Sequence, residues 1–314
     1  MLCRDRRALL CALASTLFLP NHTARAQEDV AVPRSAQIRY DRNTRVPTAI
    51  RTEVKLVLIP VSVTDPYQRP VLDLKTQNFR LFDEGAEQKI SKLSLEEEPV
   101  SVGMVFDASY SMRNKLRNSR EALAEFLRTS TPGDEFSLWK FGSRPEPVCL
   151  FTMDDEEIQD NLSRIQPQGY TSLFDALYLA LNQMKRASRA TKALLVLSDG
   201  GDNNSRYTER EIRTMVREAD VRIFSISIMD RSPVLERISD ESGGRAYRVH
   251  KLDELTEMAT RLSAEIHSRY VLGYRPQNAQ NDGKYHRVTV KLVPGAASGP
   301  LHLAWRHGYY ARLP

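Results

Sequence analysis

Cysteine is almost absent from the part of the chain that we expect to fold. The sequence has 314 residues and three cysteines, two of which, Cys3 and Cys11, precede residue 27. Residues 1–26 have the pattern of a secretory signal peptide, with a basic start, a short apolar stretch and small residues before a cut after Ala26. Cleavage would leave only Cys149, which excludes an intramolecular disulfide. The fold must therefore rest on its hydrophobic core, with or without the help of a metal.

Long apolar runs are also lacking. The run over residues 8–20 is shorter than the roughly 20 residues that a permanent membrane span needs. No other segment is as long and as apolar. We therefore expect no membrane span after signal cleavage, and a protein that is either secreted or periplasmic.

A strong excess of positive charge is missing once the leader is removed. The whole chain has a formal net charge of +5, and residues 1–26 contribute four arginines against one aspartate. The remaining charge of +2 gives no support for a nucleic-acid partner. With 41% hydrophobic and 27% charged residues, the composition is that of an ordinary globular protein.

Signatures of common catalytic sites are missing as well. The six histidines are scattered, and none has the spacing of a zinc-ligand pair. The sequence contains no G-x-S-x-G nucleophile elbow and no G-x-x-x-x-G-K-[ST] phosphate-binding loop. We therefore expect a protein that is not an enzyme.

The residue pattern divides the chain into segments of different kinds. Alternating apolar residues and turn residues indicate β-strands in two blocks, which are separated by a stretch where strands and helices alternate. Each β block is too small to bury a face alone, so we expect the two to pair into one sandwich. The expected segments are a signal peptide at 1–26, a linker or arm at 27–50, β blocks at 51–97 and 269–314, and an α/β domain at 98–268.

The α/β stretch predicts a doubly wound, mainly parallel sheet. Residues 100–106, 193–198 and 221–227 are continuous apolar runs, as expected for strands buried on both faces. Residues 171–186 carry apolar side chains at helical spacing. Strands alternating with helices favour parallel strands joined by helical crossovers, the Rossmann-like arrangement.

Oxygen-bearing side chains follow the ends of the predicted strands. The candidates are Asp107, Ser109 and Ser111 after one strand, Asp199 after another, and Thr171 at the start of a helix between them. Ligands of parallel α/β sheets bind beyond the carboxyl ends of the strands, where these loops converge. In an extended loop, alternate residues point the same way. Hydroxyl and carboxylate oxygens suit Mg²⁺. Each piece taken alone is also consistent with a turn or a helix cap.

The three motifs together resemble a known family. "DASYSM", "GYTSLFDAL" and "LSDGGDN" are similar to the metal-ion-dependent adhesion site of von Willebrand factor type A domains. The resemblance implies that all five candidates surround Mg²⁺, Mn²⁺ or Ca²⁺, which grips an Asp or Glu of a partner protein. The flanking "FRLFDEGAEQKI" and "YVLGYRP" resemble secreted bacterial von Willebrand A-related proteins. No oligomeric state follows from it.

Some residues depart from the family pattern or allow another interpretation. Tyr110 stands where the family often has glycine, and Arg113 and Lys115 stand where related chains carry acids for a second ion, so we expect their positive charge to favour acidic partners. Asp202 is interpreted as a solvated loop acid and Asp175 as a surface or capping residue. Two alternatives remain open. One is a phosphatase-type metal-dependent hydrolase, although Ser109 replaces its usual second aspartate. The other is a scaffold with an idle metal site.

Overall fold

The computed structural model describes residues 56–277, 282–296 and 299–311. The predicted signal peptide and linker lie outside these residues. No helix in the described ranges has the length and apolar character that crossing a membrane requires.

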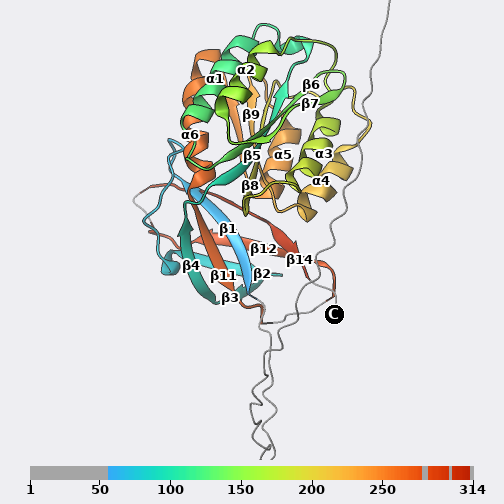
Figure 1. Cartoon of the computed structure of the whole chain (residues 1–314). Helices are drawn as coiled ribbons and strands as arrows, with labels where there is room; N and C mark the ends of the chain where they lie inside the picture. Colours follow the sequence, from blue (N-terminus) through green and yellow to red (C-terminus); the bar gives the residue numbers. More distant parts are fainter. Residues whose placement is uncertain (1–55, 278–281, 297–298, 312–314) are drawn as a thin grey trace, which may run out of the picture. The chain divides into compact units, whose positions relative to one another are not determined.

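A six-stranded sheet forms the centre of the α/β part (Figure 1), in the order β10-β9-β8-β5-β6-β7. Its strands are β5 (Val100–Asp107), β6 (Glu135–Phe141), β7 (Pro145–Thr152), β8 (Thr191–Ser198), β9 (Arg222–Ile228) and β10 (Ala246–Val249). All neighbours pair in parallel except β6 and β7, which are antiparallel. Every residue of β5 and β9 is buried, which explains their unbroken apolar character.

Helices cover both faces of this sheet. They are α1 (Leu116–Arg128), α2 (Asp155–Arg164), α3 (Leu173–Met184), α4 (Glu209–Glu218), α5 (Pro233–Ser242) and α6 (Leu255–His267). One apolar cluster joins α1, α2 and α6 to side chains of β5 such as Met104 and Phe106. A second joins α3, α4 and α5 to the opposite face, where Val105 points. The sheet is therefore doubly wound, which confirms the predicted fold class.

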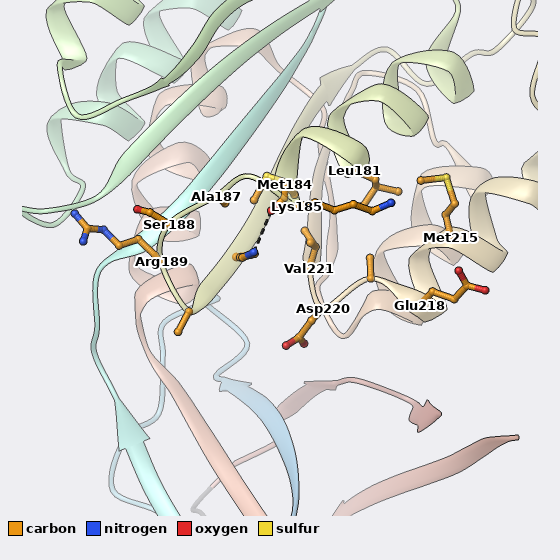
Figure 2. A pocket seen from close by; sticks show the side chains of 13 residues that line it. Leu181, Met184, Lys185, Ala187, Ser188, Arg189, Met215, Glu218, Asp220 and Val221 are labelled. Carbon is orange, nitrogen blue, oxygen red and sulfur yellow. Dashed lines mark hydrogen bonds between the residues drawn. The ribbon is translucent and has the colours of Figure 1, made fainter. Parts of the chain in front are cut away.

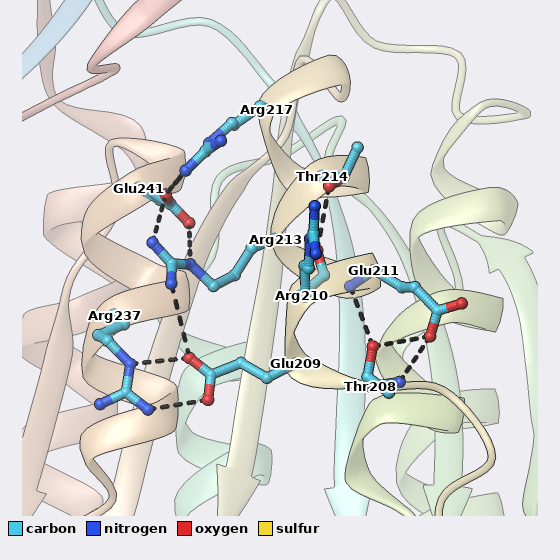
Figure 3. Close-up of polar contacts among 9 residues, drawn as sticks. All are labelled: Thr208, Glu209, Arg210, Glu211, Arg213, Thr214, Arg217, Arg237 and Glu241. Carbon is cyan, nitrogen blue, oxygen red and sulfur yellow. Dashed lines mark hydrogen bonds and ion pairs between the residues drawn. The ribbon is translucent and has the colours of Figure 1, made fainter.

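Local signals set the ends of several helices. Thr208 and Glu211 form a capping box at the start of α4, and Gly243 ends α5 in the left-handed conformation, with φ of 79°. Ion pairs then join α4 to α5 (Figure 3): Glu209 with Arg237, and Glu241 with Arg213 and Arg217. Such partly exposed pairs contribute modestly to stability and mainly set how the two helices align.

Two antiparallel sheets make up the β-sandwich, in the orders β13-β1-β11-β4 and β14-β12-β2-β3. Their strands are β1 (Val57–Thr64), β2 (Phe79–Asp83), β3 (Ala86–Gln88), β4 (Ile90–Glu96), β11 (Arg269–Tyr274), β12 (Tyr285–Leu292), β13 (His302–Trp305) and β14 (Gly308–Tyr310). Strand β1 pairs with β11 and β13, and β2 pairs with β12. One apolar cluster, which includes Leu81 and Leu272, fills the space between the sheets. The predicted pairing of the two β blocks into a sandwich is confirmed.

Candidate metal centre

Asp107 ends β5, the central strand, and is completely buried. Its Oδ1 accepts a hydrogen bond from the Ser109 backbone N–H at 2.9 Å, and its Oδ2 accepts one from Ser198 Oγ at 2.6 Å. Burial raises the pKa of this carboxyl to about 6, against the lowering effect of these hydrogen bonds. Ser198 ends β8, the strand beside β5. The carboxylate is therefore held by groups from two neighbouring strand ends.

The two serines that follow Asp107 face one another. Ser109 Oγ and Ser111 Oγ lie 2.9 Å apart, with Ser109 buried and Ser111 exposed. The loop is not extended as we predicted, because residues Tyr110–Met112 form a 3-10 turn, with Met112 N–H donating to the Ser109 carbonyl. The turn brings the two hydroxyls together, although the alternation of side chains in an extended strand does not apply to a 3-10 turn.

Thr171 lies in a second loop that is bonded to the first. The Tyr110 backbone N–H donates to the Gly169 carbonyl at 3.1 Å, and the Gln168 N–H donates to the Ala108 carbonyl at 2.6 Å. Thr171 is 5% exposed. Within the described residues its hydroxyl makes no hydrogen bond, and none connects its side chain directly to the other candidates. Thr171 lies just before α3, whose N-cap residue is Ser172 rather than Thr171.

Asp199 follows β8 and contacts the first loop through a lysine. Lys115 Nζ lies 2.9 Å from Asp199 Oδ2, and the two side chains are only 15% and 10% exposed. The positive charge of Lys115 is thus engaged inside the site and is not presented to partners, contrary to our expectation. The Arg113 side chain is exposed, and its guanidinium makes no hydrogen bond or ion pair with any described residue.

Asp175 and Asp202 connect the 202–207 loop to the start of α3 through hydrogen bonds. Asp202 Oδ1 accepts hydrogen bonds from the Phe174 N–H at 3.3 Å and from Ser205 Oγ at 2.5 Å. Asp175 Oδ1 accepts from the backbone N–H groups of Arg206 and Tyr207. Asp202 is therefore not the solvated loop acid that we predicted, and Asp175 is not a cap of α3, whose N-cap is Ser172. Both acids hold the 202–207 loop against the start of α3.

Sequence reasoning did not identify two further residues of the site. Ser198 bonds to Asp107, as described, and Asn203 Oδ1 accepts from the Thr171 N–H at 2.9 Å while its own N–H donates to the Thr171 carbonyl. Ser198 could have been predicted, because it ends a buried strand and directly precedes the candidate Asp199. The role of Asn203 could not be predicted from the sequence, because it depends on the path of the loop around Thr171, 32 residues earlier.

The donor set fits a hard cation. Two ligands about 2.1 Å from an octahedral ion and at right angles to each other lie about 3 Å apart, close to the Ser109–Ser111 separation of 2.9 Å. The described residues contain no group of three or more His, Cys, Asp or Glu side chains that could hold a metal. Hydroxyl oxygens would therefore have to complete the coordination. The Lys115 ammonium already places one positive charge beside Asp199.

A cavity of about 600 Å³ lies at the amino-terminal ends of the central strands (Figure 2), where α3 ends and β8 begins. Lys192 Nζ donates to the Met184 carbonyl there at 3.1 Å and so satisfies a carbonyl at the end of α3. Because β8 runs parallel to β5, the start of β8 lies at the opposite end of the sheet from Asp107, which ends β5. None of the five candidate ligands lines this cavity.

Comparison with known proteins places the α/β part. Residues 101–261 match the family model of the von Willebrand factor type A domain. The chain is 30% identical over 171 residues to the human inter-alpha-trypsin inhibitor heavy chain H4 and 29% identical over 169 residues to the pig protein. Each alignment covers 49% of this chain and 18% of the relative, so the chain matches less than a fifth of the length of these relatives.

Among solved structures, the von Willebrand factor type A protein from Catenulispora acidiphila is similar to this chain with a TM-score of 0.50 and 15% identity. The superposition covers 77% of this chain and 74% of the other. It shows a shared fold that extends beyond the residues matched by the family model.

Proposed function

Because this chain belongs to the von Willebrand factor type A family, we propose that it is an exported, non-enzymatic binding protein whose metal-ion-dependent adhesion site grips an acidic residue of a partner protein. Domains of this family commonly serve as protein-interaction modules. The metal is Mg²⁺, or Mn²⁺ or Ca²⁺ in its place. Its proposed ligands, bound directly or through water, are Asp107, Ser109, Ser111, Thr171 and Asp199.

One observation supports this proposal above the others: the paired hydroxyls of Ser109 and Ser111 lie beside a buried carboxylate at the carboxyl end of the central strand. When bound, the cation would supply a local positive charge and an open coordination position for a partner's carboxylate. The chain's own residues orient this charge. Ser198 holds one oxygen of Asp107, and Asn203 holds the Thr171 backbone.

The test is calorimetric titration of the chain from Gln27 onward with Mg²⁺ and Mn²⁺. Asp107→Ala removes a proposed ligand and should abolish binding. Because Asp107 is buried, its replacement could also disturb the fold of the domain and obscure the result. A second variant is therefore needed. Thr171→Val keeps the side-chain shape and removes a hydroxyl that has no hydrogen-bond partner among the described residues. We expect metal affinity to fall roughly tenfold, or about 1.4 kcal/mol, with an unchanged melting temperature.

Thr214→Val is the matched control for Thr171→Val. The Thr214 hydroxyl bonds only to the Arg210 carbonyl, on the exposed face of α4, so its loss should leave metal affinity as in the parent chain. Unchanged metal binding in both Asp107→Ala and Thr171→Val would contradict the proposed site. A pull-down from envelope and extracellular fractions, with Mg²⁺ against EDTA, then tests whether the captured proteins depend on the metal.

A further inference from the structure

A cavity of about 680 Å³ lies beside the loop that carries Thr171, although none of the five proposed metal ligands lines it. It lies between the β6–β7 link, α3 and the 202–207 loop, and Ser143, Asp175 and Asn204 are among its lining residues. Two hydrogen bonds connect it to the loop of Thr171: Asn204 donates its backbone N–H to the Thr171 carbonyl at 3.1 Å, and Ser143 Oγ accepts from the Tyr170 N–H at 3.0 Å. A ligand at the metal centre and one in this cavity would be neighbours.

Two arginines stand at the cavity with uncommitted charges. Arg144 and Arg206 both line it, and both are exposed. Within the described ranges, neither guanidinium makes a hydrogen bond or an ion pair. Other arginines of the α/β part are engaged in ion pairs, as Arg213, Arg217 and Arg237 are in Figure 3. A guanidinium fork binds carboxylates through two parallel hydrogen bonds, so these two groups suit an acidic ligand.

The acids that line the same cavity are committed to the protein. Asp175 accepts hydrogen bonds from two backbone N–H groups of the 202–207 loop. Glu211 accepts from the N–H and the hydroxyl of Thr208 in the capping box. Internal hydrogen bonds therefore occupy oxygens of both acids and keep them ionised, and the arginines are the charged groups whose donors are left to meet a ligand.

A rigid aromatic platform completes the cavity. Tyr178 and Tyr207 stack with ring centroids 3.9 Å apart and planes 13° apart, and both line the cavity. Toward the metal centre, Tyr110 and Tyr170 are 65% and 68% exposed. Tyrosine and arginine are the residue types enriched at the energetic centres of protein interfaces, because they supply contact area and hydrogen bonds at low entropic cost.

We propose that this cavity, with Arg144, Arg206 and the Tyr178–Tyr207 stack, is a second anchor for an acidic segment of a partner protein that reaches the metal centre with another carboxylate. The inference rests on the proposed function for the position of that first carboxylate. The arginines select additional carboxylates, and the rings pack against the apolar stems between them. The partner is thus a stretch of polypeptide rich in Asp or Glu.

The experiment measures the binding of a short fluorescein-labelled oligoglutamate peptide by anisotropy, in Mg²⁺ and in EDTA, with oligoglutamine as the neutral counterpart. The test variant is Arg144→Glu with Arg206→Glu. The control is Lys185→Glu with Arg186→Glu, which makes the same charge change at exposed residues at the far end of α3. We expect the test variant to raise Kd at least about tenfold, and the control to change it less than about twofold, because charge effects fade beyond the Debye length.

Calorimetry on the same test variant checks that it still binds the metal at least as tightly as the parent chain, which separates a lost anchor from a damaged fold, since added negative charge near the cation does not weaken its binding. Equal losses in test and control, or no loss in either, would overturn the inference, as would a parent chain that does not bind the peptide. So would a sulfated oligosaccharide that binds as tightly with the same arginine dependence, since the cavity would then be a general polyanion site. Arginine-dependent binding that ignores EDTA would instead overturn the proposed metal function alone.

Discussion

The α/β part and the β-sandwich differ in how the chain builds them. The α/β part is one continuous stretch, from Val100 at the start of β5 to His267 at the end of α6. The sandwich combines strands from both sides of that stretch, so that β1 pairs with β11, more than 200 residues later. All five proposed metal ligands belong to the α/β part. The difference indicates that the site depends on neighbouring crossovers, whereas the sandwich depends on long-range closure.

Buried polar contacts join the two parts, while their apolar clusters remain separate. Arg222 of β9 is 4% exposed and donates to Ser62 Oγ of β1 at 3.0 Å and to the Ile266 carbonyl of α6 at 2.6 Å. Burial lowers its pKa to about 9. Arg245 likewise donates to Thr64 of β1. Because no apolar cluster is shared between the two parts, we expect the two cores to respond separately to mutation.

The largest expected effect is on the sandwich core. Leu272 of β11 is fully buried within the sandwich cluster. Leu272→Ala should lower the free energy of unfolding by about 2–5 kcal/mol through lost contacts and a cavity, as measured by urea denaturation. Leu58→Ala, on β1 with the side chain 49% exposed, should stay within about 0.5 kcal/mol. Metal affinity should be the same in both. A weaker metal site in Leu272→Ala alone would show that the sandwich shapes the site.

The next effect is on the reactivity of Cys149, a buried thiol on β7. Burial raises the pKa of this thiol to about 11. In the chain from Gln27 onward, its alkylation by iodoacetamide at pH 8 should be on the order of 100-fold slower than that of a free thiol, because the thiolate is the nucleophile. The rate should rise about tenfold per pH unit up to about pH 10.

The same thiol reports on opening of the α/β part. Leu195→Ala, in the α/β core, should speed alkylation, whereas Leu272→Ala should not. Equal acceleration by both variants would show that the two parts unfold as one cooperative unit.

The smallest expected effect is electrostatic. Lys115→Met removes the ammonium that lies 2.9 Å from Asp199 and should tighten Mg²⁺ binding roughly three- to tenfold, since like charges at this range repel. Lys291→Met removes the same charge from an exposed position of β12 in the sandwich and should leave the metal affinity measured by calorimetry unchanged. Weaker binding in Lys115→Met would mean that the lysine positions Asp199 rather than competing with the metal.

Much of the fold was predictable because it follows from local patterns. The continuous apolar runs became the fully buried strands β5, β8 and β9, apart from Lys192 of β8, which is half-buried. The helical pattern over residues 171–186 became α3 (Leu173–Met184). The sandwich followed from the small size of each β block. The predictions failed where a loop's path decides contacts: the turn at Tyr110–Met112, the pairing of Lys115 with Asp199, and the bonds of Asp202.

The sequence by itself determined which residue types stand at the carboxyl ends of the strands, because apolar periodicity sets the strands and their ends. It also determined that a doubly wound sheet would form, since strands and helices alternate. Only the tertiary structure decided which of these groups meet. The Ser109–Ser111 contact arises from the 3-10 turn within one loop, whereas the Lys115–Asp199 pair and the cavity beside Thr171 arise from loops that are separated along the chain. Hydrogen bonds between backbone groups hold those loops together, and such bonds depend on three-dimensional path rather than on residue type.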